Sequence, residues 1–288
     1  MKAVIPAAGF GTRFLPFTKS VPKELIPVVD KPVLQYVVEE AAASGITELL
    51  IILSEGKESI VRHFGPEPAL EQRLEETKKF ELLKKVRSVG CGLSIQFTYQ
   101  HVLNGLGGAI LCARDFVGND PFAVLLGDNV TSGEPPVLAE LLEVFRKKNA
   151  FAVAVEQVPR DRVDRYGIVD GVEEEKGVYR LRSLVEKPDP EEAPGDLAIA
   201  SRYVFPAEIM DCLEQTPPGK NNEVQLTDAM CLLLQRRGGY AVKVRGKRHD
   251  AGEKLSFLKT TLDFAMRREE LRAPLLAKMK ELIARYDQ

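Results

Sequence analysis

The sequence has few of the residue types that build metal cages, disulfide frameworks or membrane spans. Its 288 residues include three histidines and four widely separated cysteines, with no C-x-x-C pair: Cys91, Cys112, Cys212 and Cys231. These cysteines predict neither a zinc site nor a disulfide framework and are typical of a reducing compartment. No apolar run reaches the ~18 residues that a membrane-spanning helix needs, and proline and glycine interrupt the N-terminal stretch, unlike a secretory signal. We therefore expect a cytoplasmic protein without a membrane partner.

The chain also carries almost no excess of charge of either sign. Its 40 Lys and Arg against 42 Asp and Glu give a net charge of −2, with a pI near 6.1. Proteins that bind nucleic acids usually present a basic face, so we expect no nucleic-acid partner. The composition, 44% hydrophobic and 28% charged, is that of a soluble enzyme. A chain of this length buries roughly three quarters of its unfolded surface and needs no cross-links to fold.

The first half of the chain alternates strand and helix patterns. An apolar strand candidate over residues 1–6 is followed by a helical pattern over 31–44 and a continuous apolar run over 48–54. Such a unit predicts parallel pairing of the two strands. Strand patterns recur at 93–100 and 121–128. We therefore expect an α/β fold, a Rossmann-like three-layer sandwich with a mixed, mostly parallel central sheet.

The second half is patterned differently. Four strand candidates between 151 and 205 are joined by loops that favour antiparallel insertions, and the tail from 253 to 288 is mostly helical, as is a charged stretch over 67–89. The sequence shows no repeat, low-complexity tract or flexible linker. We expect one domain over residues 1–252, with residues 253–288 as its C-terminal helical extension.

A Gly-rich loop, AAGFGTR at 7–13, directly follows the first strand. Gly9 and Gly11 permit a tight turn whose exposed N–H groups can hold an anion, and Thr12 and Arg13 add a hydroxyl and a cation. The Walker pattern is absent, and Phe14 stands where a dinucleotide-binding loop has its third glycine. By itself the loop predicts an anion site or only a strand-to-helix turn.

The continuation of this loop, LPFTKSVPKELIPVVDKPVLQYVVEE, resembles the sugar-nucleotide pyrophosphorylases and is most similar to bacterial UTP–glucose-1-phosphate uridylyltransferases. Six further motifs follow in the family's order: GLGGAI (105–110), LLGD (125–128), YGIVD (166–170), EKP (186–188), EVQLTDA (223–229) and HDAG (249–252). The resemblance covers nearly the whole chain. It implies Mg²⁺-dependent synthesis of UDP-glucose and pyrophosphate from UTP and glucose 1-phosphate by a homodimer or homotetramer. It also implies a nucleotide half over about 1–130 and a sugar-binding half over about 131–252.

This chemistry needs no protein nucleophile, because a sugar phosphate is largely dianionic near neutral pH. It needs cations and backbone donors that align the reactants and stabilise the charge of the leaving pyrophosphate. Arg13 and Lys23 are the candidate catalytic cations at the triphosphate, and the resemblance implies that Lys187 contacts the sugar phosphate. Asp128 and Asp250 are the candidate ligands for Mg²⁺, which prefers carboxylate oxygens.

The binding residues are expected in two groups. Around the nucleotide we expect Ala8, Gly9, Gly11, Thr12, Gln100, Gly105 and Gly107. The Gln100 amide can pair with a carbonyl and an N–H of uracil, and the glycines would admit the flat ring. Around the sugar phosphate the resemblance implies Gly167, Glu186, Lys187 and Glu223, with Glu186 accepting from sugar hydroxyls. A strand-end ion pair is the alternative for Glu186 and Lys187.

The sequence departs from the uridylyltransferase pattern in three motifs, one of which is HDAG in place of the more usual D-C-G or D-I-G. Gly108 replaces the histidine of G-L-G-H-A, and Asn129 gives LLGDN, a wording closer to glucose-1-phosphate thymidylyltransferases. A thymidylyltransferase or an enzyme of dual specificity therefore stays open, because a pocket discriminates one methyl group by only ~1–3 kcal/mol. A non-catalytic nucleotide-sugar-binding regulatory subunit is a further alternative. It would not need the complete set Arg13, Lys23, Asp128, Lys187 and Asp250.

Overall fold

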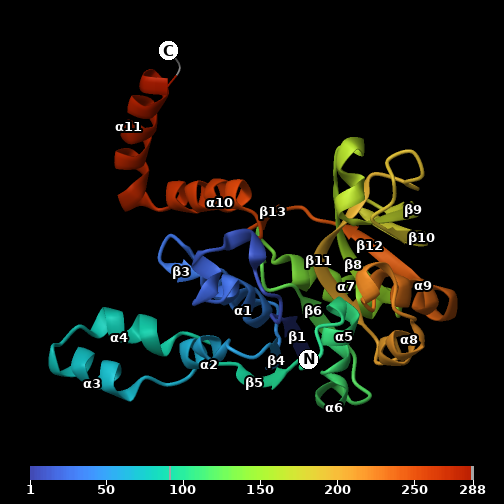
Figure 1. The fold of residues 1–288 in the computed structure, drawn as a ribbon, viewed down its shortest axis with the longest axis horizontal. Coiled ribbons are helices and arrows are strands. Elements are labelled where there is room, and N and C mark those ends of the chain that lie inside the picture. Colours follow the sequence, from blue (N-terminus) through green and yellow to red (C-terminus); the bar gives the residue numbers. More distant parts are fainter. Residues whose placement is uncertain (91, 287–288) are drawn as a thin grey trace.

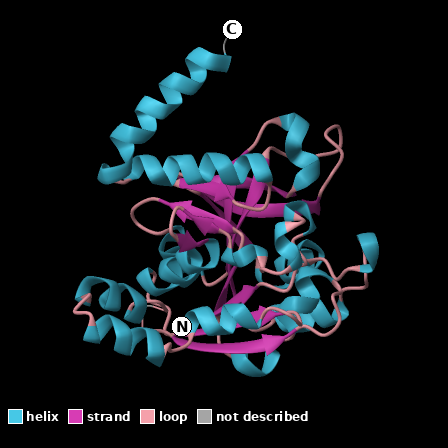
Figure 2. Ribbon diagram, turned by 60° about the vertical axis from the view of Figure 1, so that its left-hand side comes forward, coloured by secondary structure: helices cyan, strands magenta, loops and turns pink. Residues whose placement is uncertain are grey.

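A single mixed sheet forms the centre of the computed structural model, which describes residues 1–90 and 92–286. Its strand order is β5-β4-β1-β6-β11-β8-β12-β10-β9, and helices cover both of its faces (Figures 1 and 2). The three-layer α/β architecture expected from the sequence is confirmed.

The N-terminal half of the sheet is parallel. β1 pairs with β4 on one side and β6 on the other, and β4 pairs with β5. The strands are β1 (Lys2–Pro6), β4 (Glu48–Leu53), β5 (Ser94–Tyr99) and β6 (Phe122–Leu125). β1, β4 and β6 are apolar and mostly buried on both faces, as internal parallel strands are. β5, at the edge of the sheet, alternates polar and apolar residues instead.

The remainder of the sheet is mixed. Its strands are β8 (Phe151–Gln157), β9 (Gly167–Glu175), β10 (Val178–Glu186), β11 (Leu197–Phe205) and β12 (Gly239–Lys243). β11 is antiparallel to both β6 and β8, and β10 to both β9 and β12, whereas β8 and β12 are parallel. Among the described strands, four of the eight neighbouring pairs are therefore parallel. The prediction of a mostly parallel sheet holds only for the N-terminal half, because β11 enters the middle of the sheet in the opposite direction.

Alternate residues of each central strand belong to two separate hydrophobic cores. On β1, Ala3 and Ile5 pack against helices of one face, whereas Val4 packs against helices of the other. The first face is covered by α1 (Val33–Ala43), α2 (Glu58–Phe64) and α7 (Val137–Lys148). The second is covered by α5 (Gly105–Leu111), α6 (Arg114–Val117), α8 (Ile209–Gln215) and α9 (Leu226–Arg237).

The charged stretch at 67–89 forms two helices, α3 (Pro68–Glu76) and α4 (Phe80–Arg87). The single helix that we expected is interrupted because Lys78 has a φ of 54°, which a right-handed helix cannot contain. The tail forms α10 (Lys254–Arg267) and α11 (Glu269–Tyr286). α11 buries none of its residues and projects from the body (Figure 1). In the described part of the chain, no helix has the length and apolar character that crossing a membrane requires.

Two small ribbons and several 3₁₀ turns complete the fold. One ribbon pairs β2 (Pro27–Val28) with β3 (Lys31–Pro32), and the other pairs β7 (Asn129–Ser132) with β13 (Lys247–Asp250). The 3₁₀ turns are η1 (Thr12–Phe14), η2 (Phe17–Lys19), η3 (Lys23–Leu25), η4 (Arg160–Arg165) and η5 (Lys220–Asn222). The β7–β13 ribbon places Asp250 directly opposite Asn129, although the two are far apart in sequence.

A bulge in β11 fixes the turn that follows β6. The pairing of β11 with β8 shifts register between Ile199 and Tyr203, and Ser201 within it has a φ of 63°. Its carbonyl accepts a hydrogen bond from the backbone N–H of Leu126 (3.1 Å). The bulge therefore holds the residues that lead to Asp128.

Replacing Ser201 with glycine should stabilise the protein. A left-handed conformation costs an L-residue about 1–2 kcal/mol, whereas glycine adopts it freely but loses about 0.5–1 kcal/mol through greater unfolded-state entropy. Ser201→Gly should therefore raise the urea midpoint by the equivalent of about 0.5–1 kcal/mol. As a matched control, Ser94→Gly in the ordinary backbone of β5 should lower it, and a lower midpoint for both variants would contradict the assignment of strain.

Candidate active site

Two cavities lie where the Gly-rich loop, the turn after β6 and β13 meet. The first, of about 550 Å³, lies at the carboxyl end of β1, where α/β sheets place ligands. It gathers most of the predicted nucleotide site together with one of the candidate Mg²⁺ ligands: Ala8, Gly9, Gly11, Thr12, Lys23, Gln100, Gly105 and Asp128. Glu223, which the resemblance assigned to the sugar phosphate, also lines this first cavity and not the second. The second, of about 730 Å³, contains Arg13, Lys187 and Asp250.

Three predicted site residues lie outside the lining of both cavities: Gly107, Gly167 and Glu186. The N–H of Gly107 donates to the carbonyl of Val224 (2.9 Å), and a methyl group on Gly107 would lie 2.7 Å from that oxygen. A methyl group on Gly167 would lie 3.0 Å from Oγ1 of Thr227. The same hydroxyl donates to Oε2 of Glu186 (2.6 Å). These glycines permit close packing between chain segments.

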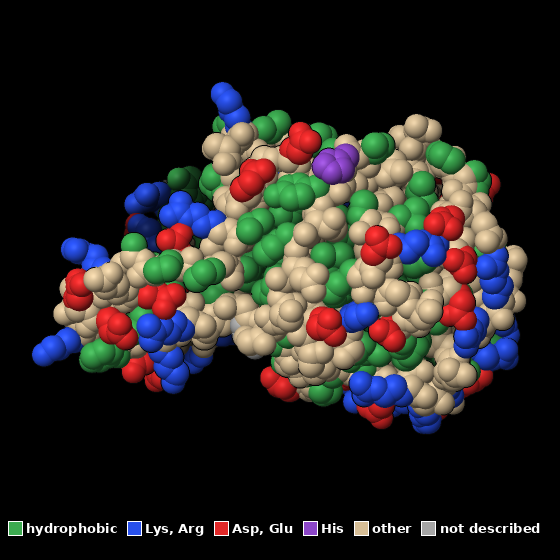
Figure 3. Space-filling view, turned by 90° about the horizontal axis from the view of Figure 1, so that it is seen from below, with side chains coloured by type: hydrophobic (Ala, Val, Ile, Leu, Met, Phe, Trp, Pro, Cys, Tyr) green, Lys and Arg blue, Asp and Glu red, His purple; other side chains and the backbone are tan. Residues whose placement is uncertain are grey.

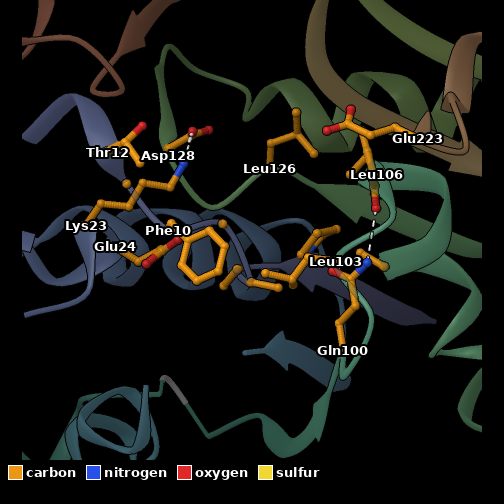
Figure 4. Close-up of a pocket in the computed structure, with 17 residues that line it drawn as sticks. Phe10, Thr12, Lys23, Glu24, Gln100, Leu103, Leu106, Leu126, Asp128 and Glu223 are labelled. Carbon is orange, nitrogen blue, oxygen red and sulfur yellow. Dashed lines mark hydrogen bonds and ion pairs between the residues drawn. The ribbon is translucent and has the colours of Figure 1, made fainter. Parts of the chain in front are cut away.

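The first cavity is polar at its two ends and apolar between them. Figure 4 shows Lys23 and Asp128 at one end and Gln100 at the other, with Phe10 between them. Phe10 is 72% exposed, so its ring presents a free apolar surface. Nε2 of Gln100 donates to Oδ1 of Asn104 (3.1 Å) and to the carbonyl of Gly105 (3.2 Å). This order of charge, apolar surface and amide suits a nucleotide, whose phosphates and base lie at opposite ends.

Lys23 and Asp128 form an ion pair with a Nζ–Oδ2 distance of 2.7 Å, and Nδ2 of Asn129 donates to the other carboxylate oxygen (2.8 Å). Burial favours a higher pKa for Asp128, but the Lys23 ammonium and the hydrogen bonds from Asn129 and the backbone together outweigh it and hold this pKa below its usual value. Burial lowers the pKa of Lys23, but the charges of Asp128 and Glu24 outweigh burial and leave the pKa raised. Both groups are therefore charged at neutral pH.

Asp250 joins this charged end from the second cavity. The N–H of Ala251 donates to the carbonyl of Asp128 (3.0 Å). A methyl group on Gly252 would lie 3.0 Å from Oδ1 of Asp250, 3.6 Å from Oδ2 of Asp128 and 3.8 Å from Nη1 of Arg13. Burial, together with the charge of Asp128, raises the pKa of Asp250. Two carboxylates that face one small space fit a Mg²⁺ ion, which typically takes one or two protein carboxylates together with water and substrate phosphates.

The second cavity is rich in cations. Lys187 has a φ of 46°, its N–H donates to the carbonyl of Tyr166 (3.0 Å), and its Nζ lies 3.4 Å from Oε1 of Glu186. The strand-end ion pair and the cavity position of Lys187 therefore coexist. Arg162 and Arg165 from η4 line the same space. Guanidinium and ammonium groups in this number suit a phosphate.

Sequence reasoning missed three polar residues around the first cavity: Glu24, Lys57 and Asn104. Glu24 and Lys57 are only 1% and 6% exposed and form an ion pair of 2.9 Å. Lys57 stands in the segment SEGKES, where a lysine is ordinarily solvated. The only available signal was the position of Glu24 beside Lys23.

The Asn104 side chain accounts for the glycine at position 108. A methyl group on Gly108 would lie 1.7 Å from Oδ1 of Asn104. The amide of Asn104 therefore occupies the space that a larger side chain at 108 would enter, and it holds Gln100 from there.

Alanine at Gly107 should lower stability, whereas alanine at Gly108 should weaken nucleotide binding. Gly107→Ala meets the Val224 backbone at 2.7 Å and Leu213 at 2.9 Å, so it should cost about 1–3 kcal/mol and several degrees of Tm. Gly108→Ala meets only the end of the Asn104 side chain, which can rotate away. Its Tm should change little, whereas loss of the Gln100–Asn104 bond should weaken nucleotide binding by about fivefold. Thermal denaturation and calorimetric titration of both variants test this, and the reverse pattern would refute it.

Comparisons with known proteins show which family this chain belongs to. Residues 2–266 match the model of the nucleotidyl transferase family. The UTP–glucose-1-phosphate uridylyltransferase of Bacillus subtilis is 46% identical over 98% of this chain and 97% of its own. The structure of UDP-glucose pyrophosphorylase from Acinetobacter baumannii has a TM-score of 0.89 at 37% identity, covering 98% of this chain and 99% of its own. The UTP-bound form has a TM-score of 0.88 at 38% identity, covering 99% of each chain. The resemblance predicted from the motifs is therefore confirmed: the chain belongs to the nucleotidyl transferase family and, within it, to the UTP–glucose-1-phosphate uridylyltransferases.

Proposed function

We propose that this chain forms UDP-glucose and pyrophosphate from UTP and glucose 1-phosphate. The observation that carries the proposal is the convergence of Arg13, Asp128 and Asp250 beside Gly252, with Lys23 on Asp128, where the two cavities meet. One cavity has the polarity of a nucleotide site and the other the cations of a phosphate site. The relatives named as uridylyltransferases support the same reaction.

The reaction is a direct displacement. An oxygen of glucose 1-phosphate attacks the α-phosphorus of UTP, and the bond to the bridging oxygen breaks as pyrophosphate leaves with the electron pair. Lys23 and Arg13 hold and stabilise the charge of the leaving group, and Lys187 holds the attacking phosphate in the second cavity. Removal of a proton by the protein is not required, because the attacking phosphate is already largely dianionic.

Asp128 and Asp250 are the residues that would hold Mg²⁺. When bound, the ion supplies positive charge beside the phosphates of the two substrates. Lys23 is paired with Oδ2 of Asp128. Its ammonium carries positive charge, as Mg²⁺ does, so the two would compete for this carboxylate oxygen.

We assign the base end of the first cavity to Gln100, Gly105 and the apolar surface of Phe10. UTP is the proposed nucleotide because the chain's relatives carry that specificity in their names. The names of these relatives favour UTP more strongly than the two departures at Gly108 and Asn129 favour dTTP. Asn129 lies outside the lining of the first cavity and contacts Asp128, so its identity is tied to the carboxylate and carries no preference between uracil and thymine.

Initial rates with the two nucleotides test the proposed substrate. With glucose 1-phosphate and Mg²⁺, kcat/KM should be higher for UTP than for dTTP by about 10- to 200-fold, the range that one methyl group yields. Pyrophosphate release can be followed continuously for both. An equal or greater kcat/KM with dTTP would contradict the assignment of UTP. If neither nucleotide gave pyrophosphate release, the proposed nucleotidyltransferase activity would be wrong.

Removing one of the two carboxylates tests the proposed metal site. Asp250→Asn should reduce the rate at saturating UTP by at least about 100-fold, because a metal ion supplies several kcal/mol of charge stabilisation. It should also shift the Mg²⁺ concentration at half-maximal rate upwards. Asp120→Asn is the control, since this exposed residue pairs with Lys2 at the start of β1, whereas the site lies at the carboxyl end of that strand. A wild-type Mg²⁺ dependence in Asp250→Asn would exclude Asp250 as a ligand.

We also propose that the protein is a cytoplasmic homodimer or homotetramer with small molecules as its other partners. Cys112, Cys212 and Cys231 are free thiols, whereas Cys91 lies outside the described residues. Figure 3 shows basic and acidic side chains interspersed on one face, with hydrophobic ones gathered in its middle.

Exposed apolar side chains follow α10 and α11: Leu255, Leu258, Leu262, Leu276, Leu282 and Ile283. Such rows mark protein interfaces.

Light scattering on the eluted protein tests the assembly. The mass should be two or four times the 31.9 kDa of the chain. Charged residues in place of Leu276 and Ile283 should shift it towards one chain. A wild-type mass of 31.9 kDa at micromolar concentration would contradict the proposal.

A further inference from the structure

A buried lysine outside the lining of the first cavity holds the Gly-rich loop. Lys57, the residue before α2, directs its ammonium to the carbonyl oxygens of Ala7 (2.5 Å) and Gly9 (2.7 Å). The same ammonium lies 3.0 and 2.9 Å from the two carboxylate oxygens of Glu24. Lys57 is 6% exposed and lies outside the lining of both cavities, so it is not placed to touch a substrate.

The two carbonyls need this donor because the loop has no regular partner. The segment that follows β1 belongs to neither helix nor strand until η1 begins at Thr12. Ala7 is buried, and a buried carbonyl without a donor is costly, whereas the bond to the Gly9 carbonyl is partly buried. Both residues line the first cavity. Because Lys57 engages both carbonyl oxygens, its positive charge compensates two negative peptide ends beside the place proposed for the triphosphate.

The ion pair with Glu24 extends this hold to the second element of the site. Glu24 is 1% exposed and lies in η3, next to Lys23. A methyl group on Gly9 would lie 3.8 Å from Cε of Lys23, so the loop and Lys23 are already in contact. One ammonium therefore connects the loop, through Ala7 and Gly9, with the turn that presents Lys23.

Stability alone gives a poor account of this pair. Burial raises the pKa of Glu24 and lowers that of Lys57, which shows that desolvation opposes both charges. Buried ion pairs are often no more stable than apolar residues of similar volume. What an apolar pair could not supply is a donor for the two loop carbonyls.

We propose that Lys57 is a positioning residue that sets the Gly-rich loop and Lys23 at the spacing that binds the triphosphate. This inference rests on the proposed function, because the triphosphate is the ligand assigned to the first cavity. Glu24 serves as the counter-charge that keeps the lysine ionised and aimed.

The test separates the charge pair from the carbonyl contacts. Glu24→Gln combined with Lys57→Met removes both charges and the donor, whereas Glu24→Gln combined with Lys57→Gln removes both charges but keeps an N–H donor. Each single variant leaves a buried charge unpaired and should lower Tm strongly. Lys148→Met is the matched control, because this lysine also bridges two carboxylates, those of Glu174 and Glu175, but far from the site.

Binding of UTP with Mg²⁺ is measured by calorimetry without glucose 1-phosphate, alongside Tm. Both double variants should regain most of the Tm lost in the single variants. The methionine double variant should bind UTP at least about tenfold more weakly than wild type, the glutamine double variant should be intermediate, and Lys148→Met should bind normally. Wild-type affinity in the methionine double variant, or equal affinity in both double variants, would overturn the proposal.

If the methionine double variant does not fold, the glutamine double variant decides, because wild-type affinity there would overturn the proposal. Turnover by the wild-type protein, measured in the same preparation, tests the proposed function. The ratio of variant to wild-type Kd tests the positioning role, so the two can fail separately.

Discussion

Asp128 connects three segments of the chain that form the site. Its Oδ2 lies 2.7 Å from Nζ of Lys23 in η3, and its Oδ1 accepts a hydrogen bond from Asn129. Its backbone carbonyl accepts a hydrogen bond from the N–H of Ala251. A negative group here would repel a triphosphate unless cations accompany it. Carboxylates and cations alternate around the space beside Gly252, an arrangement that the proposed binding of a triphosphate requires.

The remaining structure keeps this set in place. The β11 bulge holds the turn before Asp128 through the Leu126–Ser201 hydrogen bond. Arg202, which is fully buried, donates to the carbonyl of Asn129 and to the carboxylate of Glu40, both at 2.7 Å. The turn is thereby joined to α1 on one face of the sheet. On the other side of the charged end, Lys57 holds the loop and Glu24 together. Binding groups attached to rigid elements lose little entropy when a substrate arrives.

Motif order predicted correctly that the candidate cations and aspartates line the two cavities, with Lys23 and Asp128 in the first and Arg13, Lys187 and Asp250 in the second. It did not predict where Glu186, Glu223 and two of the glycines lie. Glycine is ambiguous in a sequence. Gly9 borders the first cavity, whereas Gly107 serves contact with Val224, and only the packing of distant segments distinguishes the two uses. The same limit hid Lys57, whose three partners lie 33 to 50 residues away.

The fold was predictable where the pattern is local. The βαβ unit over residues 1–54 follows from apolar runs and helix signals, whereas the direction of β11 depends on pairing with strands far along the chain. The separation of α3 from α4 depends on one lysine with positive φ, which no periodicity records.

The most direct measurement is a crystal structure of the chain with UTP and Mg²⁺. We expect the metal ion between Asp128 and Asp250, and Lys23 released from Asp128 to a phosphate oxygen, because the ion would then neutralise the carboxylate. The uracil should lie beside Phe10 and Gln100. An intact Lys23–Asp128 pair, with the triphosphate and metal ion bound away from Gly252, would contradict this account.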